Sequence, residues 1–119
     1  MKGQEFVSKV YAELVENSVS QYREMYEKAN PERASDEFGR KAICFYQGLS
    51  SDDKEVLLQM MRQVSVDTVS HIFAVLDGVS WLEGQESDFC LSQEHSRGTL
   101  INGDLQGMFL EQDEIRSNQ

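Results

Sequence analysis

Asp67 and His71 are the pair of residues in this sequence whose types and spacing come closest to chemistry. Side chains at i and i+4 of a helix meet on one face, so the carboxylate could orient the imidazole as a general base or a metal ligand. The same spacing is more often an ordinary surface pair. We therefore interpret the pair as a hydrogen bond or ion pair on the surface of the helix, and keep a small metal-dependent enzyme using Asp67 and His71 as an alternative.

A metal site would need a third ligand, and no candidate stands at a recognisable spacing. The sequence also lacks a G-x-S-x-G elbow, a P-loop and a dinucleotide-binding glycine pattern. We predict no metal ligands and no cofactor, and we favour a binding protein over an enzyme. The residues considered as a third ligand are His95, Asp77, Glu83, Glu86 and Asp88.

Two helices are expected in the N-terminal half. Apolar residues recur at spacings of three and four from Glu5 to about Ala29, and the Asn30–Pro31 step should end that helix. A shorter helix should begin at Ser35 or Asp36 and end near Gly48.

A third helix should hold Asp67 and His71. It is expected over residues 52–77, opened by the D-x-x-E capping box at Asp52, with Ser50 or Ser51 as competing caps, and ended at Gly78. Apolar residues cover an arc of about 200° around it, so it should be the central helix. Its narrow polar strip consists of Gln59, Gln63, Asp67, Ser70, His71 and Asp77.

The pattern changes after Gly78. Alternation around Phe89 and Leu91, followed by β-prone residues 99–101, predicts a small β-hairpin near residues 88–102 that lies on the helices. Asp104 can cap a short last helix, with a frayed tail after about residue 115. The expected fold is mainly α: one domain over residues 1–119, a bundle of three helices plus a short C-terminal helix and the hairpin.

Charge is distributed unevenly along the chain. Residues 1–62 hold 11 acids and 9 bases, whereas residues 63–119 hold 10 acids and only two bases, Arg97 and Arg116. A negative field repels phosphate backbones and anionic membranes, and it attracts basic proteins. We therefore expect no nucleic-acid or membrane partner and a basic protein as the partner, although acidity can also serve solubility alone.

Trp81 is the candidate anchor for such a partner. It is the single tryptophan, and it follows the expected end of the third helix beside Glu83, Glu86 and Asp88. An aromatic residue within a charged rim is a common hot-spot arrangement. The alternative, which we favour, is that Trp81 folds back over the helix end as core, together with Val79 and Leu82.

These patterns favour a small acidic cytoplasmic protein-interaction module. Inhibitors and immunity-type proteins that bind basic partners offer an analogy at the level of class. A homodimeric structural protein that buries part of the third helix is a second alternative.

The start of the sequence resembles no signal peptide, and Cys44 and Cys90 are expected to be small buried hydrophobes. The binding candidates are Trp81, Glu83, Glu86, Asp88 and Asp77, and the polar-strip candidates are Asp67, His71 and Gln63.

Overall fold

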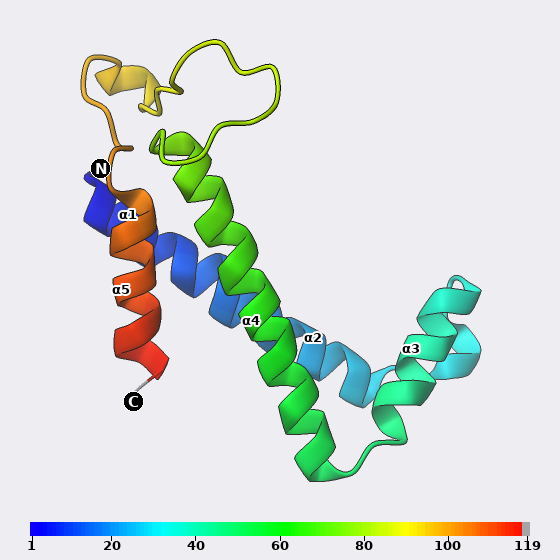
Figure 1. Ribbon diagram of the computed structural model, residues 1–119. Helices are drawn as coiled ribbons and strands as arrows, with labels where there is room; N and C mark the ends of the chain where they lie inside the picture. Colours follow the sequence, from blue (N-terminus) through cyan, green and yellow to red (C-terminus); the bar gives the residue numbers. More distant parts are fainter. Residues whose placement is uncertain (118–119) are drawn as a thin grey trace.

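The computed structural model describes residues 1–117, and every regular element in that range is helical (Figure 1). Residues 118 and 119, which belong to the tail expected to fray, lie outside the described residues, and α5 continues to Ser117. The predicted mainly helical bundle is confirmed. The elements are α1 (Gly3–Val10), η1 (Tyr11–Glu16), α2 (Asn17–Lys28), η2 (Pro31–Arg33), α3 (Glu37–Gln47), α4 (Ser51–Leu76), η3 (Glu94–Ser96) and α5 (Leu105–Ser117).

The first predicted helix is present as one continuous rod formed by α1, η1 and α2. Its middle segment, η1, is a π-helical turn that carries the fully buried side chains of Tyr11 and Val15. The rod ends at Ala29, whose backbone is extended, and Pro31 opens the short turn η2. The Asn30 side chain caps this turn by accepting a hydrogen bond from the backbone N–H of Glu32 at 3.0 Å. The Asn30–Pro31 step therefore ends the helix as predicted.

The predicted caps of α3 and α4 are present, with one change. Asp36 accepts the Gly39 N–H at 2.6 Å and opens α3. At the start of α4, Ser50 rather than Asp52 is the N-cap, and its hydroxyl accepts the Asp53 N–H at 3.1 Å. The helix ends before Gly78, where φ is +79°, a conformation that glycine adopts without strain.

The predicted β-hairpin at residues 88–102 is wrong: the described residues contain no strand, and this segment is irregular apart from η3. Of the expected ladder, one backbone bond forms, from Ile101 N–H to Leu91 O at 2.8 Å. The side chain of Asn102 replaces the others. Its Oδ1 accepts the Leu91 N–H at 2.8 Å, and its Nδ2 donates to the carbonyls of Phe89, at 2.9 Å, and Leu76. The Asn102 side chain thus satisfies the Phe89 carbonyl and the Leu91 N–H, which would otherwise pair with a second strand, and it ties both to the end of α4.

The main core lies where α1 and η1 pack against α4 and α5. Phe73 of α4 meets Phe109 of α5 edge to face with ring centroids 5.4 Å apart. Phe109 is completely buried, so truncating it to alanine should cost about 3–5 kcal/mol. The buried cluster comprises Val7, Tyr11, Val15, Val66, Phe73, Ile101, Leu105 and Phe109.

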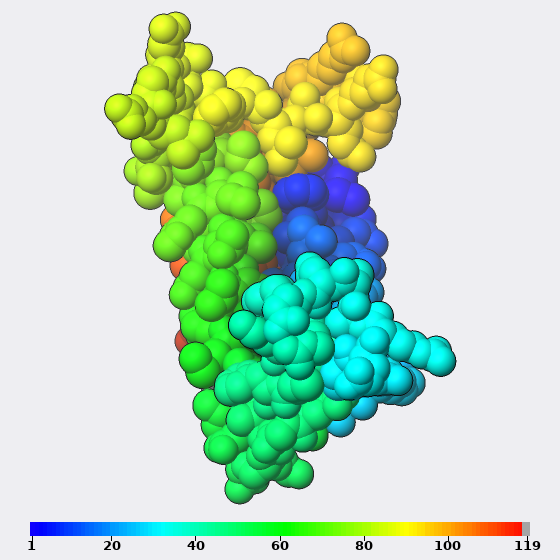
Figure 2. All heavy atoms as spheres, turned by 90° about the vertical axis from the view of Figure 1, so that its right-hand side faces the viewer, coloured from blue at the N-terminus to red at the C-terminus, as the bar shows by residue number. Residues whose placement is uncertain are grey.

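The molecule is open rather than spherical. Its radius of gyration is 17.9 Å, whereas a compact chain of this length should have about 13.5 Å. In Figure 1, α3 lies at the far end of the rod from α5, and Figure 2 shows the loop between α4 and α5 projecting at the end opposite α3. Cys44 and Cys90 are both exposed, so the prediction that they are buried is wrong.

Helix α4 is central, but it is not covered all round. Leu58, Val66 and Phe73 are buried, whereas Met60 and Val64 are more than half exposed. The broad apolar arc therefore exceeds what the rest of the chain covers. None of the described helices combines the length and the apolarity needed to span a bilayer.

Candidate functional site

Asp67 and His71 do not form a dyad. Both side chains are exposed on α4, and Asp67 instead accepts a hydrogen bond from the Gln63 side-chain amide at 2.9 Å. Among residues 1–117, no group of three His, Cys, Asp or Glu side chains is placed to hold a metal ion. The polar-strip candidates Gln63, Asp67 and His71 thus share a solvent-facing strip without a third group to complete a site. Ser70, which the helical pattern places in the same strip, is instead buried and accepts a hydrogen bond from Gln106 Nε2 at 3.1 Å.

Trp81 lies in the loop directly after α4, and its side chain is 50% exposed. Val79 and Leu82, its apolar neighbours in sequence, are 72% and 56% exposed. The structure therefore does not bury this segment against the end of α4 as core. An exposed tryptophan between two exposed aliphatic residues forms an apolar surface whose burial against a partner is energetically favourable.

The acidic candidates Glu83, Glu86 and Asp88 surround this segment in sequence, and all three are exposed. Within the described chain, none of them lies in an ion pair, whereas acids of the N-terminal half pair with bases at several positions. The carboxylate of Asp88 also lies close to Gly78, where an added Cβ would meet its Oδ1 at 3.0 Å. The negative charge of this loop is thus not neutralised by the N-terminal half.

Asp77, the fifth binding candidate, has a different position. It is half-buried at the end of α4, and both its oxygens accept backbone hydrogen bonds at the start of α5. Oδ1 binds the Gly103 N–H and Oδ2 binds the Gln106 N–H, each at 2.8 Å. A carboxylate at a helix N-terminus satisfies donors that have no partner within the helix, and it interacts favourably with the helix dipole. Asp77 therefore joins α4 to α5, and these bonds fix the two ends of the loop that connects the helices.

The loop between α4 and α5 is thereby held at both ends. Asp77 fixes its junction with α5, and Asn102 ties its backbone to Leu76, Phe89 and Leu91. Within the loop, the Gln85 side chain accepts the Leu82 N–H and donates to the carbonyl of Ser87. These bonds order an irregular segment that lacks regular secondary structure, so Trp81 is presented on a supported loop.

A polar cluster that the sequence patterns do not indicate lies between η1, α4 and α5. Tyr11 donates a hydrogen bond to Asp113 at 2.6 Å, and Arg62 donates to the Tyr11 hydroxyl and pairs with Asp113 at 3.1 Å. The guanidinium of Arg116 lies 4.8 Å from the centre of the Tyr11 ring and pairs with Glu16 at 3.0 Å. Burial raises the pKa of Tyr11 well above its ordinary value, and the hydrogen bond to Asp113 raises it further. Tyr11 therefore stays protonated, and its hydroxyl connects η1 to α4 through Arg62 and to α5 through Asp113. Its role is structural rather than that of a general base.

A second cluster joins α2, α3 and α4. Tyr46 donates to Glu27 at 2.8 Å, Lys54 lies 5.1 Å from the Tyr46 ring centre, and Arg23 pairs with Glu55 through two bonds of 2.5 and 3.1 Å. Burial and the bond to Glu27 raise the pKa of Tyr46. Spacing along the sequence could not reveal either cluster, because their hydrogen bonds and ion pairs join residues that are 19 to 102 positions apart.

Comparison of the chain with protein-family models, with curated proteins and with solved structures found no match.

Proposed function

We propose that the protein is a small binding module that docks a basic protein on the loop between α4 and α5, as an inhibitor or immunity-type protein does. One observation carries this proposal. Trp81 is half exposed and is followed in sequence by the exposed carboxylates of Glu83, Glu86 and Asp88, which form no ion pair within residues 1–117. The loop thus combines an aromatic anchor with a negative rim.

The two parts of the loop have separate roles in binding. The carboxylates attract a basic surface over a distance and orient it, which raises the association rate at low salt. Trp81 and its neighbours Val79 and Leu82 then lose water against an apolar patch of the partner, which slows dissociation. Because Asp77 and Asn102 hold the loop in place before binding, little ordering cost remains.

The charge of the C-terminal half supports a protein partner over a nucleic acid. Ten acids against two bases in residues 63–119 would repel a phosphate backbone, because nucleic-acid binding depends on lysine and arginine displacing counterions. The neighbouring ion pair of Arg97 with Glu94 is long, at 4.0 Å, and exposed, so it changes this field little.

The proposal can be tested by affinity capture from the source cell with the full chain at about 50 and 500 mM salt. We expect a basic protein to be captured at low salt and lost at high salt. Trp81→Ala should weaken capture by at least tenfold, as the loss of a hot-spot residue does. Phe38→Ala is the matched control, since Phe38 is an aromatic residue 77% exposed on α3 at the other end of the molecule.

A second variant isolates the electrostatic part. Replacing Glu83, Glu86 and Asp88 by their amides should reduce the association rate and flatten its salt dependence, while Glu111→Gln and Glu114→Gln, on the exposed surface of α5, should have a smaller effect. As the single tryptophan, Trp81 also reports binding directly through its fluorescence. Capture of no basic protein, or capture that is indifferent to salt and to both loop variants, contradicts the proposal.

A further inference from the structure

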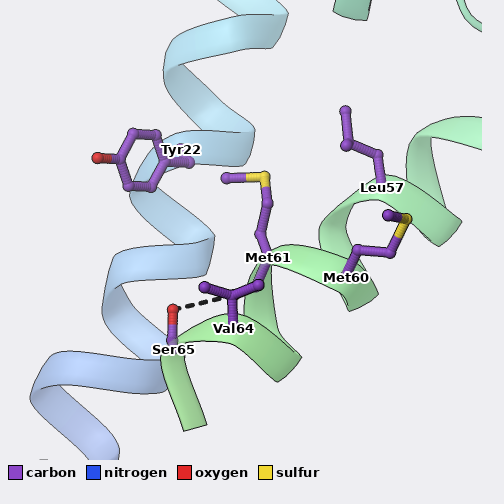
Figure 3. Close-up of a pocket in the computed structure, with 6 residues that line it drawn as sticks. All are labelled: Tyr22, Leu57, Met60, Met61, Val64 and Ser65. Carbon is purple, nitrogen blue, oxygen red and sulfur yellow. Dashed lines mark hydrogen bonds between the residues drawn. The ribbon is translucent and has the colours of Figure 1, made fainter. Parts of the chain in front are cut away.

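An uncovered apolar groove lies between α2, α3 and α4, at the end of the molecule away from the acidic loop. The part between α2 and α4 has a volume of about 430 Å³ (Figure 3). It is lined by Tyr22 of α2 and by Leu57, Met60, Met61, Val64 and Ser65 of α4. In Figure 3 the Met61 side chain points towards Tyr22 across the groove.

The groove continues towards α3. Leu57 and Met61 also line an adjoining hollow of about 270 Å³, where they are joined by Phe45, Tyr46, Tyr26 and Ala42. None of the residues lining either part is charged. We call the two parts together the α2–α3–α4 groove.

A ridge borders the same groove. Val56, Met60 and Val64 follow one another at i, i+4 and i+8 on α4, and they are 54%, 60% and 65% exposed. Such an i±4 row is the feature that packs between the rows of another helix. The face therefore carries both a protruding apolar row and an apolar hollow.

The exposed apolar area of this face is a large part of what a stable dimer covers. Tyr22, Phe45, Val56, Met60 and Val64 are each about half exposed or more, which gives roughly 500 Å² of side-chain surface, and the partly exposed groove floor adds to it. A standard interface covers about 800 Å² on each partner. The largest apolar patch on a typical monomer measures about 300–600 Å² and often marks a binding surface, so this face has the size of an interaction surface.

The distribution of charge favours a second copy of the chain as the occupant. The face belongs mainly to residues 1–62, whose net charge is only −2, whereas residues 63–119 carry −8. Near the face, Arg23 is paired with Glu55 and Lys54 with Glu27, whereas the exposed Asp52, four residues before Val56 on α4, lies in no ion pair among residues 1–117. Because the net charge of this half is small, repulsion between two copies that meet here is weak, and their acidic loops stay at the distant ends (Figure 2).

We propose that two copies of this chain form a two-fold dimer through this face, with the ridge Val56, Met60 and Val64 of each chain in the α2–α3–α4 groove of the other. A two-fold interface needs one self-complementary patch, and a ridge beside a hollow on the same face satisfies that requirement. The inference is independent of the proposed basic partner, which would bind the loop at the other end. A dimer would present two such loops.

Sedimentation equilibrium of the full chain between about 1 and 100 µM tests the dimer, since a chain of 13.6 kDa should give a mass of about 27 kDa. Val64→Glu should shift the dissociation constant upwards by at least a hundredfold, because it places a charge in the apolar contact. Ile115→Glu is the matched control, since Ile115 is also a β-branched residue, 49% exposed, but lies on α5. We expect the control to dimerise like the wild type.

Met60→Glu should repeat the effect of Val64→Glu, and far-UV circular dichroism should show both variants folded, because neither side chain is part of the buried core. The dimer should persist in 1 M NaCl, unlike binding of a basic protein at the loop. A wild-type chain that is monomeric at 100 µM overturns the inference. So does a Val64→Glu variant, shown to be folded, that dimerises as well as the wild type, or a monomer that binds phosphatidylcholine vesicles through this face instead.

Discussion

Replacing Asp77 by alanine should destabilise the fold by separating α5 from α4. The change removes the acceptor of two backbone hydrogen bonds, from Gly103 and Gln106, each of 2.8 Å. Loss of a capping side chain costs about 0.5–2 kcal/mol, and loss of a hydrogen bond to a charged group costs about 1.5–3 kcal/mol. Since Gly103 is exposed and its N–H can turn to water, we expect a loss of about 2 kcal/mol in the free energy of unfolding.

The corresponding change in melting temperature follows from the chain length. An unfolding entropy of about 2.1 cal/mol/K per residue gives about 0.25 kcal/mol/K for 119 residues, so 2 kcal/mol lowers the Tm by about 8 °C. Asp77→Asn keeps one oxygen acceptor and should lose about half as much. Thermal unfolding followed by circular dichroism measures both, and amide hydrogen exchange should show faster exchange at Gln106.

Asp67→Ala is the control for this experiment, because Asp67 is an exposed acid on the same helix that accepts one side-chain hydrogen bond within the described residues, from Gln63. We expect it to change the free energy of unfolding by less than about 0.5 kcal/mol. If Asp77→Ala melts within about 2 °C of the wild type, the capping role that we assign to Asp77 is refuted.

Three further variants test other contacts of the structure. Asn102→Asp keeps the shape of the side chain but cannot donate to the carbonyls of Leu76 and Phe89, so chemical denaturation should show a loss of about 2–3 kcal/mol. Tyr11→Phe should lose about 1–2 kcal/mol, and the loss should be equal at about pH 7 and pH 9. A raised tyrosine pKa gives stability that is complete below the unfolded value of about 10 and declines as the pH rises through the folded value, and a loss that differs between the two pH values would contradict this assignment. His71→Asn should leave the free energy of unfolding within about 0.5 kcal/mol and leave binding unchanged, whereas a larger effect of either kind would restore a role for this exposed residue.

The helices could be predicted because each is specified by neighbouring residues. The periodic apolar pattern, the Asn30–Pro31 step, the Asp36 cap and the glycine at position 78 all act within a few residues of one another. The hairpin could not be judged in the same way. Its alternating pattern is real, but the side chain of Asn102 binds the Phe89 carbonyl and the Leu91 N–H, which a second strand would have used, and also the carbonyl of Leu76, 26 residues away at the end of α4.

The positions of the candidate site residues depended on contacts between distant segments. Nothing near Asp77 in the sequence indicates that its carboxylate caps a helix 29 residues later. Likewise, the pattern of α4 correctly shows that the helix is apolar over a broad arc, but which part is covered depends on where α5 docks. The exposed state of Trp81 is therefore a result of tertiary packing, as is the exposed ridge at Met60 and Val64.

The place of α5 in the core has a consequence for how the chain acquires its structure. Val7, Tyr11 and Val15, near the beginning, are buried in one cluster with Leu105 and Phe109, near the end, and Tyr11 and Asp113 are 102 residues apart. Closing so long a loop is entropically costly and slow. During synthesis the helix over residues 3–28 must therefore leave the ribosome before α5 can cover it, and the cluster can be completed only after residues up to Asp113 have emerged.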